Sequence, residues 1–285
     1  MLVISKCTSY DQKELIKSPI WNSIPKSVKS KKIFIKPNLV TPMTIYDCVS
    51  TTRIEVVSVL IEKLLDLGVK KIVVGDCGFK NQWANTCDST GYGTLPKRYG
   101  IKLIGLQEGE DFHKFTLIRF PEKEDYLSLF GAKISDYVLE CDAIISVPKM
   151  KIHKMARVTG SIKNLMGIMT NKGNMHPRGN ADILHKRLRD LYFLLRDRVI
   201  FSVLDGIEGS EFSEQCGIFK KSNVLGISND MWQLDVAMTK MMGINPKGVA
   251  YLEYIRRDLK ESFDLVKIGK EFVTHYEEAM RYKNG

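Results

Sequence analysis

Two pieces of sequence decide the fold: KKIFIKPNLV (residues 31–40) and TTRIEVVSVLIEKLLDLGVKKIVVGDCG (residues 51–78). The apolar run Ile33–Ile35 predicts a buried strand, which the following proline ends because proline cannot donate to a ladder. Apolar residues recur at helical spacing over 54–65, and Lys70–Val74 predicts a second strand. A strand, a helix and a strand in this order predict two parallel strands joined by a right-handed crossover.

Polar residues follow both strands at the points where they end. Lys36 and Asn38 come at the end of the first strand, and Asp76 comes at the end of the second. In open α/β sheets, the carboxyl ends of the strands collect ligand-binding residues. We therefore predict that Lys36 and Asn38 bind substrate and that Asp76 is catalytic. The alternative is a structural role in the strand ends and turns.

A third strand, Ala143–Val147, leads into a segment dense in cations. The sequence from Ile144 to Met169 is IISVPKMKIHKMARVTGSIKNLMGIM. In an extended chain, Lys151 and His153 point to the same face. His153 is the predicted proton-transfer residue, since its unperturbed pKa is about 6.5 and neighbouring lysines favour the neutral base. The alternative is a structural histidine.

The end of this segment predicts an anion-binding site. Residues 160–164 are expected to open a helix, whose free backbone N–H groups and Lys163 would hold a phosphate or carboxylate. We assign Lys151 and Lys163 catalytic roles and Asn164 a substrate-binding role. The polar loop 170–180 contains His176 and Arg178, which are predicted to bind substrate from a covering lid. An ordinary surface loop is the alternative.

A fourth strand, Val199–Leu204, is expected to end at the acidic sequence DGIEG (residues 205–209). Asp205 and Glu208 would suit a divalent metal, acid–base chemistry or hydroxyl binding.

The remaining sequence completes an α/β pattern with a mainly parallel sheet and helices on both faces. Residues 1–285 are expected to form either a single α/β unit or two closely joined lobes with a boundary near 107–142, and an antiparallel excursion is expected around 112–134. Thr51 or Thr52 is expected to cap the first long helix. The other predicted strands are 2–6, 101–106, 223–227 and 263–268, and the other predicted helices are 12–16, 134–140, 181–196, 230–241, 246–259 and a peripheral helix from Lys270 onward.

Composition limits the function classes. The net charge of +10 favours an anionic partner, while the 27% of charged residues is ordinary for a globular protein. The six cysteines form no C-x-x-C pair, so the local signature of an iron–sulfur cluster is absent. The sequence also has no G-x-G-x-x-G motif for NAD, no P-loop, no apolar run long enough for a membrane span and no signal peptide. We therefore expect a cytoplasmic protein without a membrane partner.

Several of these pieces together resemble the family catalogued as domain of unknown function 362. They are KPNLV, the unit 51–78, SVPKMKIHKMARVTGSIKNLMG, VLDGIEG and SNDMWQLDVAMTKMMGI, and the resemblance covers residues 32–252. Many family members carry an appended ferredoxin domain with four-cysteine clusters. This chain shows no such cysteine spacing, so it is expected to be a stand-alone version. The family commonly continues its DGI-EG piece with Gly-Pro, whereas this chain has Ser210 and Glu211, which puts the role of its second acidic loop in doubt.

The resemblance implies a common site but no reaction. The matching positions are Lys36, Asn38, Asp76, Lys151, His153, Lys163, Asn164, His176, Asp205 and Glu208. The family is also distantly similar to the lactate racemase type of α/β fold, which would imply a cleft between two lobes lined by His and Lys.

Three function classes follow from the sequence. The first is an enzyme that acts on a small anionic metabolite, bearing carboxylate or phosphate, by His/Lys acid–base chemistry with or without a metal. The second is an iron–sulfur or redox accessory protein, which the cysteine spacing opposes. The third is a nucleic-acid-binding protein, which charge alone supports, because no known nucleic-acid-binding motif occurs. The oligomeric state and the cofactor are left open by the sequence.

Overall fold

The computed structural model describes residues 1–39, 49–78, 82–106, 115–117, 128–129, 132–169, 177, 180–215 and 217–278. The strands are β1 (Leu2–Lys6), β2 (Lys32–Pro37), β3 (Lys71–Asp76), β4 (Lys102–Gly105), β5 (Phe115–Leu117), β6 (Lys133–Ser135), β7 (Ala143–Val147), β8 (Lys149–His153), β9 (Arg157–Thr159), β10 (Val199–Glu211) and β11 (Ile218–Ser228). The α-helices are α1 (Gln12–Lys17), α2 (Ile54–Asp66), α3 (Trp83–Thr90), α4 (Leu95–Tyr99), α5 (Asp136–Leu139), α6 (Ser161–Asn164), α8 (Ala181–Leu195), α9 (Met231–Met241) and α10 (Ala250–Leu259). Short 3-10 helices include η5 (Leu165–Ile168), η6 (Pro246–Gly248), η7 (Phe263–Leu265) and η8 (Lys270–Phe272).

The main sheet has the strand order β1-β11-β10-β7-β2-β3-β4, and β8 and β9 extend it beside β10. All neighbours from β10 to β4 are parallel, as the strand–helix–strand pattern predicts for β2 and β3. The pairs β1–β11, β10–β11 and β8–β9 are antiparallel. The predicted antiparallel excursion is present as the separate pair β5–β6. The predicted α/β class and mainly parallel sheet are therefore confirmed.

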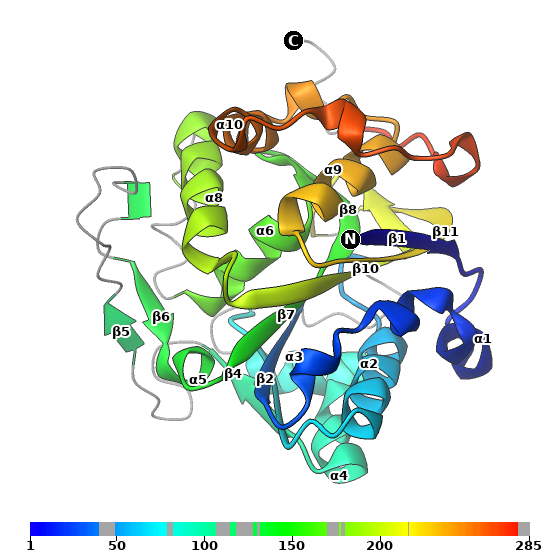
Figure 1. Ribbon diagram of the computed structural model, residues 1–285, viewed down its shortest axis with the longest axis vertical. Coiled ribbons are helices and arrows are strands. Elements are labelled where there is room, and N and C mark those ends of the chain that lie inside the picture. Colours follow the sequence, from blue (N-terminus) through cyan, green and yellow to red (C-terminus); the bar gives the residue numbers. More distant parts are fainter. Residues whose placement is uncertain are drawn as a thin grey trace.

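Helices cover both faces of this sheet because its buried strands are apolar on both sides. On β2, Phe34 packs into the apolar cluster that also contains residues of α8, α9 and α10. Ile33 and Ile35 point to the opposite face and pack into the cluster that contains α2. Figure 1 shows α8, α9 and α10 on one side of the sheet and α2 and α4 on the other.

The acidic sequence DGIEG lies inside β10, so the prediction that it follows the strand end was wrong. The strand continues through Glu211 because β11 pairs with it antiparallel along most of its length. The extra length is accommodated by a register shift between Gly206 and Glu208, which is typical of a β-bulge. Asp205 and Glu208 are consequently held by a ladder rather than by a loop.

Two predictions for the C-terminal part were also wrong. Residues 263–268 contain the 3-10 helix η7 in place of a strand, because Phe263 stacks on Trp232 and its carbonyl accepts a hydrogen bond from Lys240. The helix expected from Lys270 onward is limited in the described residues to η8, and Thr274 and Tyr276 then bond to the end of α9 through their backbone N–H groups.

The predicted threonine cap of α2 was wrong as well. The N-cap residue is Arg53, without a side-chain cap. The Thr52 hydroxyl instead donates to the Val147 carbonyl (2.7 Å) and accepts from the backbone N–H of Asn38 (2.9 Å). A cap would have required that same hydroxyl, which here joins the ends of two strands.

Several predictions lie outside the described residues. His176 and Arg178 belong to this group, with most of the loop 170–180, and so does most of the proposed lobe boundary near 107–142. Within the described part of the chain, every helix is too short or too polar to cross a membrane.

Candidate functional site

The sheet places its topological switch point between β2 and β7. From β2 the chain adds β3 and β4 on one side, and from β7 it adds β10 on the other. In open α/β sheets the crevice outside the carboxyl ends at such a point is where ligands bind. Lys36 and Asn38 lie at the end of β2, and β8 continues from β7 after a single proline. The candidate site is therefore built from the ends of these strands.

Lys36 forms the centre of a buried polar cluster. Its ammonium pairs with Asp76 Oδ1 at 2.8 Å and donates to Asn164 Oδ1 at 3.1 Å and to the Pro37 carbonyl at 2.7 Å. Only 1% of the Lys36 side chain is exposed. Asp76 also accepts from the backbone N–H groups of Leu39 and Cys77. This arrangement compensates the lysine charge inside the protein, as a buried ion pair requires.

Gly167 lies against this ion pair, and its lack of a side chain leaves room for it. A Cβ atom built at Gly167 would overlap Asp76 Oδ1 and lie 2.9 Å from the Lys36 ammonium. Any side chain at this position would displace the pair.

Asn38 and Asn164 connect the cluster to Lys151. Asn164 donates from Nδ2 to the Lys36 carbonyl (2.7 Å) and accepts at Oδ1 from Asn38 Nδ2 (3.3 Å). Asn38 Oδ1 in turn accepts from the Lys151 ammonium at 2.9 Å. Lys151 also donates to the carbonyls of Ser50 (2.9 Å) and Glu214 (3.1 Å). The structure therefore joins five predicted site residues into one network: Lys36, Asn38, Asp76, Lys151 and Asn164.

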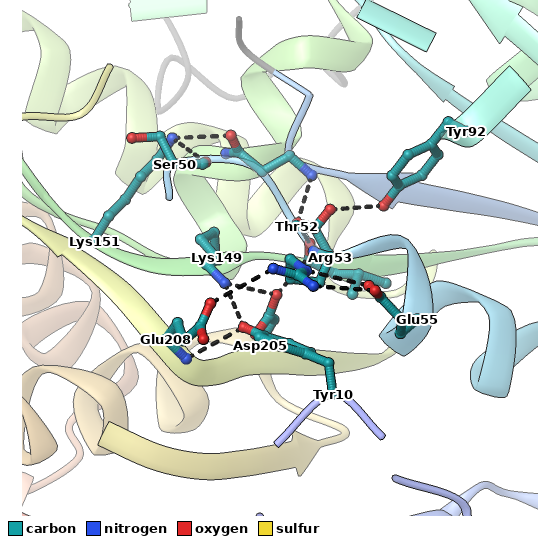
Figure 2. Close-up of polar contacts among 12 residues, drawn as sticks. Tyr10, Ser50, Thr52, Arg53, Glu55, Tyr92, Lys149, Lys151, Asp205 and Glu208 are labelled. Carbon is teal, nitrogen blue, oxygen red and sulfur yellow. Dashed lines mark hydrogen bonds and ion pairs between the residues drawn. The ribbon is translucent and has the colours of Figure 1, made fainter. Parts of the chain in front are cut away.

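A second network surrounds Lys149 and Asp205, both of which are fully buried (Figure 2). The Lys149 ammonium pairs with Asp205 Oδ2 at 3.0 Å and donates to the Tyr10 hydroxyl at 2.7 Å, which itself donates to Asp205 Oδ1 at 2.8 Å. Burial lowers the pKa of Lys149, and Asp205 opposes this effect. Burial and the same carboxylate raise the pKa of Tyr10. Proximity to the anion thus favours the neutral tyrosine and opposes the effect of burial on the lysine.

Arg53 joins this second network to Glu208. Its backbone N–H donates to Asp205 Oδ2 at 2.9 Å, and its guanidinium lies 3.7 Å from Glu208 Oε2 and pairs with Glu55 at 3.1 Å. The guanidinium also stacks over the Tyr10 ring, 4.3 Å from its centroid. The start of α2 is thereby attached to β10 (Figure 2).

His153 lies at the end of β8, and both it and Lys151 are buried in the extended strand that the sequence predicted. Its Nδ1 accepts from the backbone N–H groups of Met155 (3.0 Å) and Ala156 (3.1 Å). This geometry assigns the proton of the neutral ring to Nε2. Nδ1 thereby holds the turn between β8 and β9.

The predicted anion position at the start of α6 is occupied by the protein itself. Asp235 of α9 accepts from the backbone N–H groups of Ser161 (2.5 Å) and Ile162 (3.2 Å). The sequence pattern thus predicted an anion at the correct helix end but did not identify Asp235 as that anion. Lys163 follows on the same short helix, where it is buried beside Asn164.

No group of three or more His, Cys, Asp or Glu side chains within the described residues could hold a metal ion. The contacts of Asp205 and Glu208 described above are with protein groups. A metal role for this pair stays a prediction from the sequence.

Sequence reasoning missed four members of the two networks, namely Tyr10, Ser50, Thr52 and Arg53, and it also missed Asp235 at the start of α6. Tyr10 and Asp205 are 195 residues apart, and no periodic pattern relates them. The threonines were noticed only as helix caps. Asp235 lay within the quoted family segment. Its position between the apolar residues Leu234 and Val236 was the sign in the sequence that pointed to a buried acid.

Comparison with known proteins now places the chain in a family. Residues 33–240 match the family described as Domain of unknown function (DUF362). The chain belongs to the DUF362 family. A curated protein, the thylakoid-associated protein of Synechocystis sp., is 24% identical over 219 residues, which cover 75% of this DUF362 chain and 64% of that relative. The chain thus spans somewhat less than two thirds of the relative that it matches.

A solved structure shares the fold of this DUF362 protein. The lactate racemase apoprotein from Thermoanaerobacterium thermosaccharolyticum superimposes with a TM-score of 0.53 and 12% identity, over 84% of this chain and 56% of that one. A crystal structure of a protein from Thermotoga maritima gives a TM-score of 0.47 and 14% identity, over 76% of this chain and 56% of that one. The predicted similarity to the lactate racemase type of α/β fold is confirmed at the level of the fold.

Proposed function

We propose that the chain is an enzyme that binds a small anionic metabolite, bearing a carboxylate or phosphate, at the carboxyl ends of β2, β3 and β7. One observation carries this proposal: five polar residues from separate elements form a continuous buried network at the switch point of the sheet. Polar groups are costly to bury, so a preorganised network at this location is typical of a binding or catalytic site.

The residues fall into different roles in this proposal. Lys151 and Lys163 supply positive charge for the anion, as lysine does in many phosphate and carboxylate sites. Lys36, Asp76 and Asn164 hold the ends of β2 and β3 in position through the contacts described above. His153 donates a hydrogen bond from Nε2, which is how a neutral imidazole polarises a carbonyl. His176 and Arg178 are proposed to contact the same ligand from the loop 170–180.

The proposal is tested by a thermal-shift screen of the purified protein. The panel contains small carboxylates (lactate among them, because of the fold neighbour's name), phosphorylated metabolites and nucleotides, each with and without Mg²⁺. Lys151→Met removes the ammonium and retains much of the side-chain length. The ammonium already donates to Asn38, Ser50 and Glu214, so in this proposal it attracts the anion through its charge. At an effective dielectric constant of about 20 such an attraction is worth a few kcal/mol, so the affinity for a stabilising anion should fall roughly 10- to 100-fold.

Lys186→Met is the matched control, since Lys186 lies on the surface of α8 with 59% of its side chain exposed. If Lys151→Met does not fold, Lys163→Met provides the same comparison. The proposal is wrong if no anion of the panel stabilises the wild type. The location of the site is wrong if the lysine variants at 151 and 163 both respond as the control does.

A further inference from the structure

Asp235 is a buried acid that the proposed chemistry does not use. It lies on α9, and its carboxylate accepts hydrogen bonds from the backbone N–H groups of Ser161 and Ile162 and from the Tyr251 hydroxyl (3.1 Å). A Cβ atom built at Gly160 would overlap this carboxylate, so only glycine allows α6 to approach α9 so closely. The carboxylate therefore acts as the anion that the start of α6 requires.

The position of α6 in turn fixes the network at the switch point. Asn164 is the last residue of α6, and its amide contacts Lys36, Asn38 and the Ser146 hydroxyl. A shift of α6 would move this amide away from the ends of β2 and β7. Asp235 is thus connected to Lys36 through one four-residue helix.

We propose that Asp235 is a proton-linked positioning residue of the candidate site, which holds α6, and through Asn164 the end of β2, more firmly when it is ionised. The effect of Asp235 on ligand binding rests on the proposed function. The effect of its charge on α6 and the end of β2 can be measured in the protein without a ligand.

The surroundings of Asp235 leave it able to titrate. Burial raises the pKa of Asp235 to about 7, although the amides of Ser161 and Ile162 act in the opposite direction. Among the described residues, the titratable side chain bonded to Asp235 is Tyr251 of α10, with His185 of α8 stacked on that ring. Lys163 of α6 and Lys247 of η6 lie on other helices that pack against α9. The strands β10 and β11 face α9 with apolar residues and Gly226.

Hydrogen exchange tests this inference without a ligand. Protection of peptides covering residues 158–169 and 33–39 is measured at about pH 6, at about pH 8 and at values between them, which span the Asp235 pKa, after correction for intrinsic rates. In the wild type we expect roughly tenfold greater protection at the higher pH, because amide bonds to a carboxylate are stronger than those to a neutral acid. Asp235→Asn should show the lower protection at both values.

Asp230→Asn is the control, because Asp230 caps α9 itself and does not contact α6. Should Asp235→Asn fail to fold, Tyr251→Phe keeps the carboxylate but removes one donor, and should move the midpoint of the wild-type transition to higher pH. The inference is overturned if Asp235→Asn is folded and both peptides exchange as in the wild type, or if Tyr251→Phe leaves the midpoint unchanged. A wild type that no anion stabilises would refute the proposed function and leave these results intact.

Discussion

Asp205 and Asp235 are both completely buried, but the protein stabilises them in different ways. Asp205 has a lysine at 3.0 Å, a tyrosine hydroxyl at 2.8 Å and the backbone N–H of Arg53 at 2.9 Å. The hydrogen-bond partners of Asp235 among the described residues are two backbone amides and the Tyr251 hydroxyl, none of which carries a charge. One acid belongs to an ion pair, and the other is solvated by dipoles alone.

The difference teaches what each acid can do. The carboxylate of a buried ion pair depends on its lysine, because removing the lysine leaves an uncompensated charge. A carboxylate held only by dipoles pays the desolvation cost more fully, and its pKa rises toward neutrality. The first arrangement suits a rigid support for β8 and β10. The second suits a group that changes charge near physiological pH.

The largest effect is expected when Asp205 is deprived of its lysine. Lys149→Met should reduce the free energy of unfolding by roughly 3–5 kcal/mol, because it leaves a buried carboxylate without its counter-charge. Urea denaturation at neutral pH measures the loss. Adding Asp205→Asn to Lys149→Met should recover part of it, whereas purely additive losses would mean that the two side chains do not interact.

A somewhat smaller effect is expected from Asp235 when the free energy of unfolding is measured over a series of pH values. The folded pKa of about 7 lies above the ordinary value of 3.8, so between these values the folded state binds the proton more tightly. The contribution of Asp235 to the free energy of global unfolding, in which the carboxyl becomes hydrated, is therefore greatest at low pH and falls by on the order of 4 kcal/mol from pH 4 to pH 7. Local release of α6 has the opposite pH dependence, because it removes only the amides of Ser161 and Ile162, which favour the ionised carboxylate. Relative to Asp235→Asn, the wild type should lose stability over this window in denaturant melts, and parallel curves would contradict the assignment.

The smallest effect concerns His185 on α8. It is buried, and its Nδ1 accepts from the Tyr251 backbone N–H at 3.2 Å. Burial lowers the pKa of His185 to about 4 from its ordinary value of 6.5, so stability should fall by about 3 kcal/mol as pH drops through that window. This slope is opposite to that of Asp235. His185→Gln should remove it in thermal melts at constant ionic strength, and an unchanged slope would count against burial as its cause.

The sequence predicted the parts of the fold that depend on local patterns. Apolar runs and helical spacing located β2, α2, β3, β7 and α8 closely, and the topology then followed from general rules of α/β proteins. The same rules placed Lys36, Asn38 and Asp76 together, because the ends of parallel strands lie at one edge. These predictions succeeded since each used information contained in a short segment.

The failures arose where long-range pairing decided the outcome. Glycines within 205–209 indicated a loop, but pairing with β11 kept them in an extended strand. The helix start at Ser161 indicated a ligand site, but a carboxylate 74 residues away occupies it. No local pattern contains either partner, so neither result was accessible without the three-dimensional arrangement.

The tyrosines beside the two acids have a consequence for how this protein can be divided. The family match ends at residue 240, whereas Tyr251 lies beyond it, and the match begins at residue 33, whereas Tyr10 lies before it. A fragment cut at these limits would retain Lys149, Asp205 and Asp235 but lose both hydroxyls that bond to the acids. The segment that matches the family is therefore shorter than the segment that supplies hydrogen-bond partners to both buried acids.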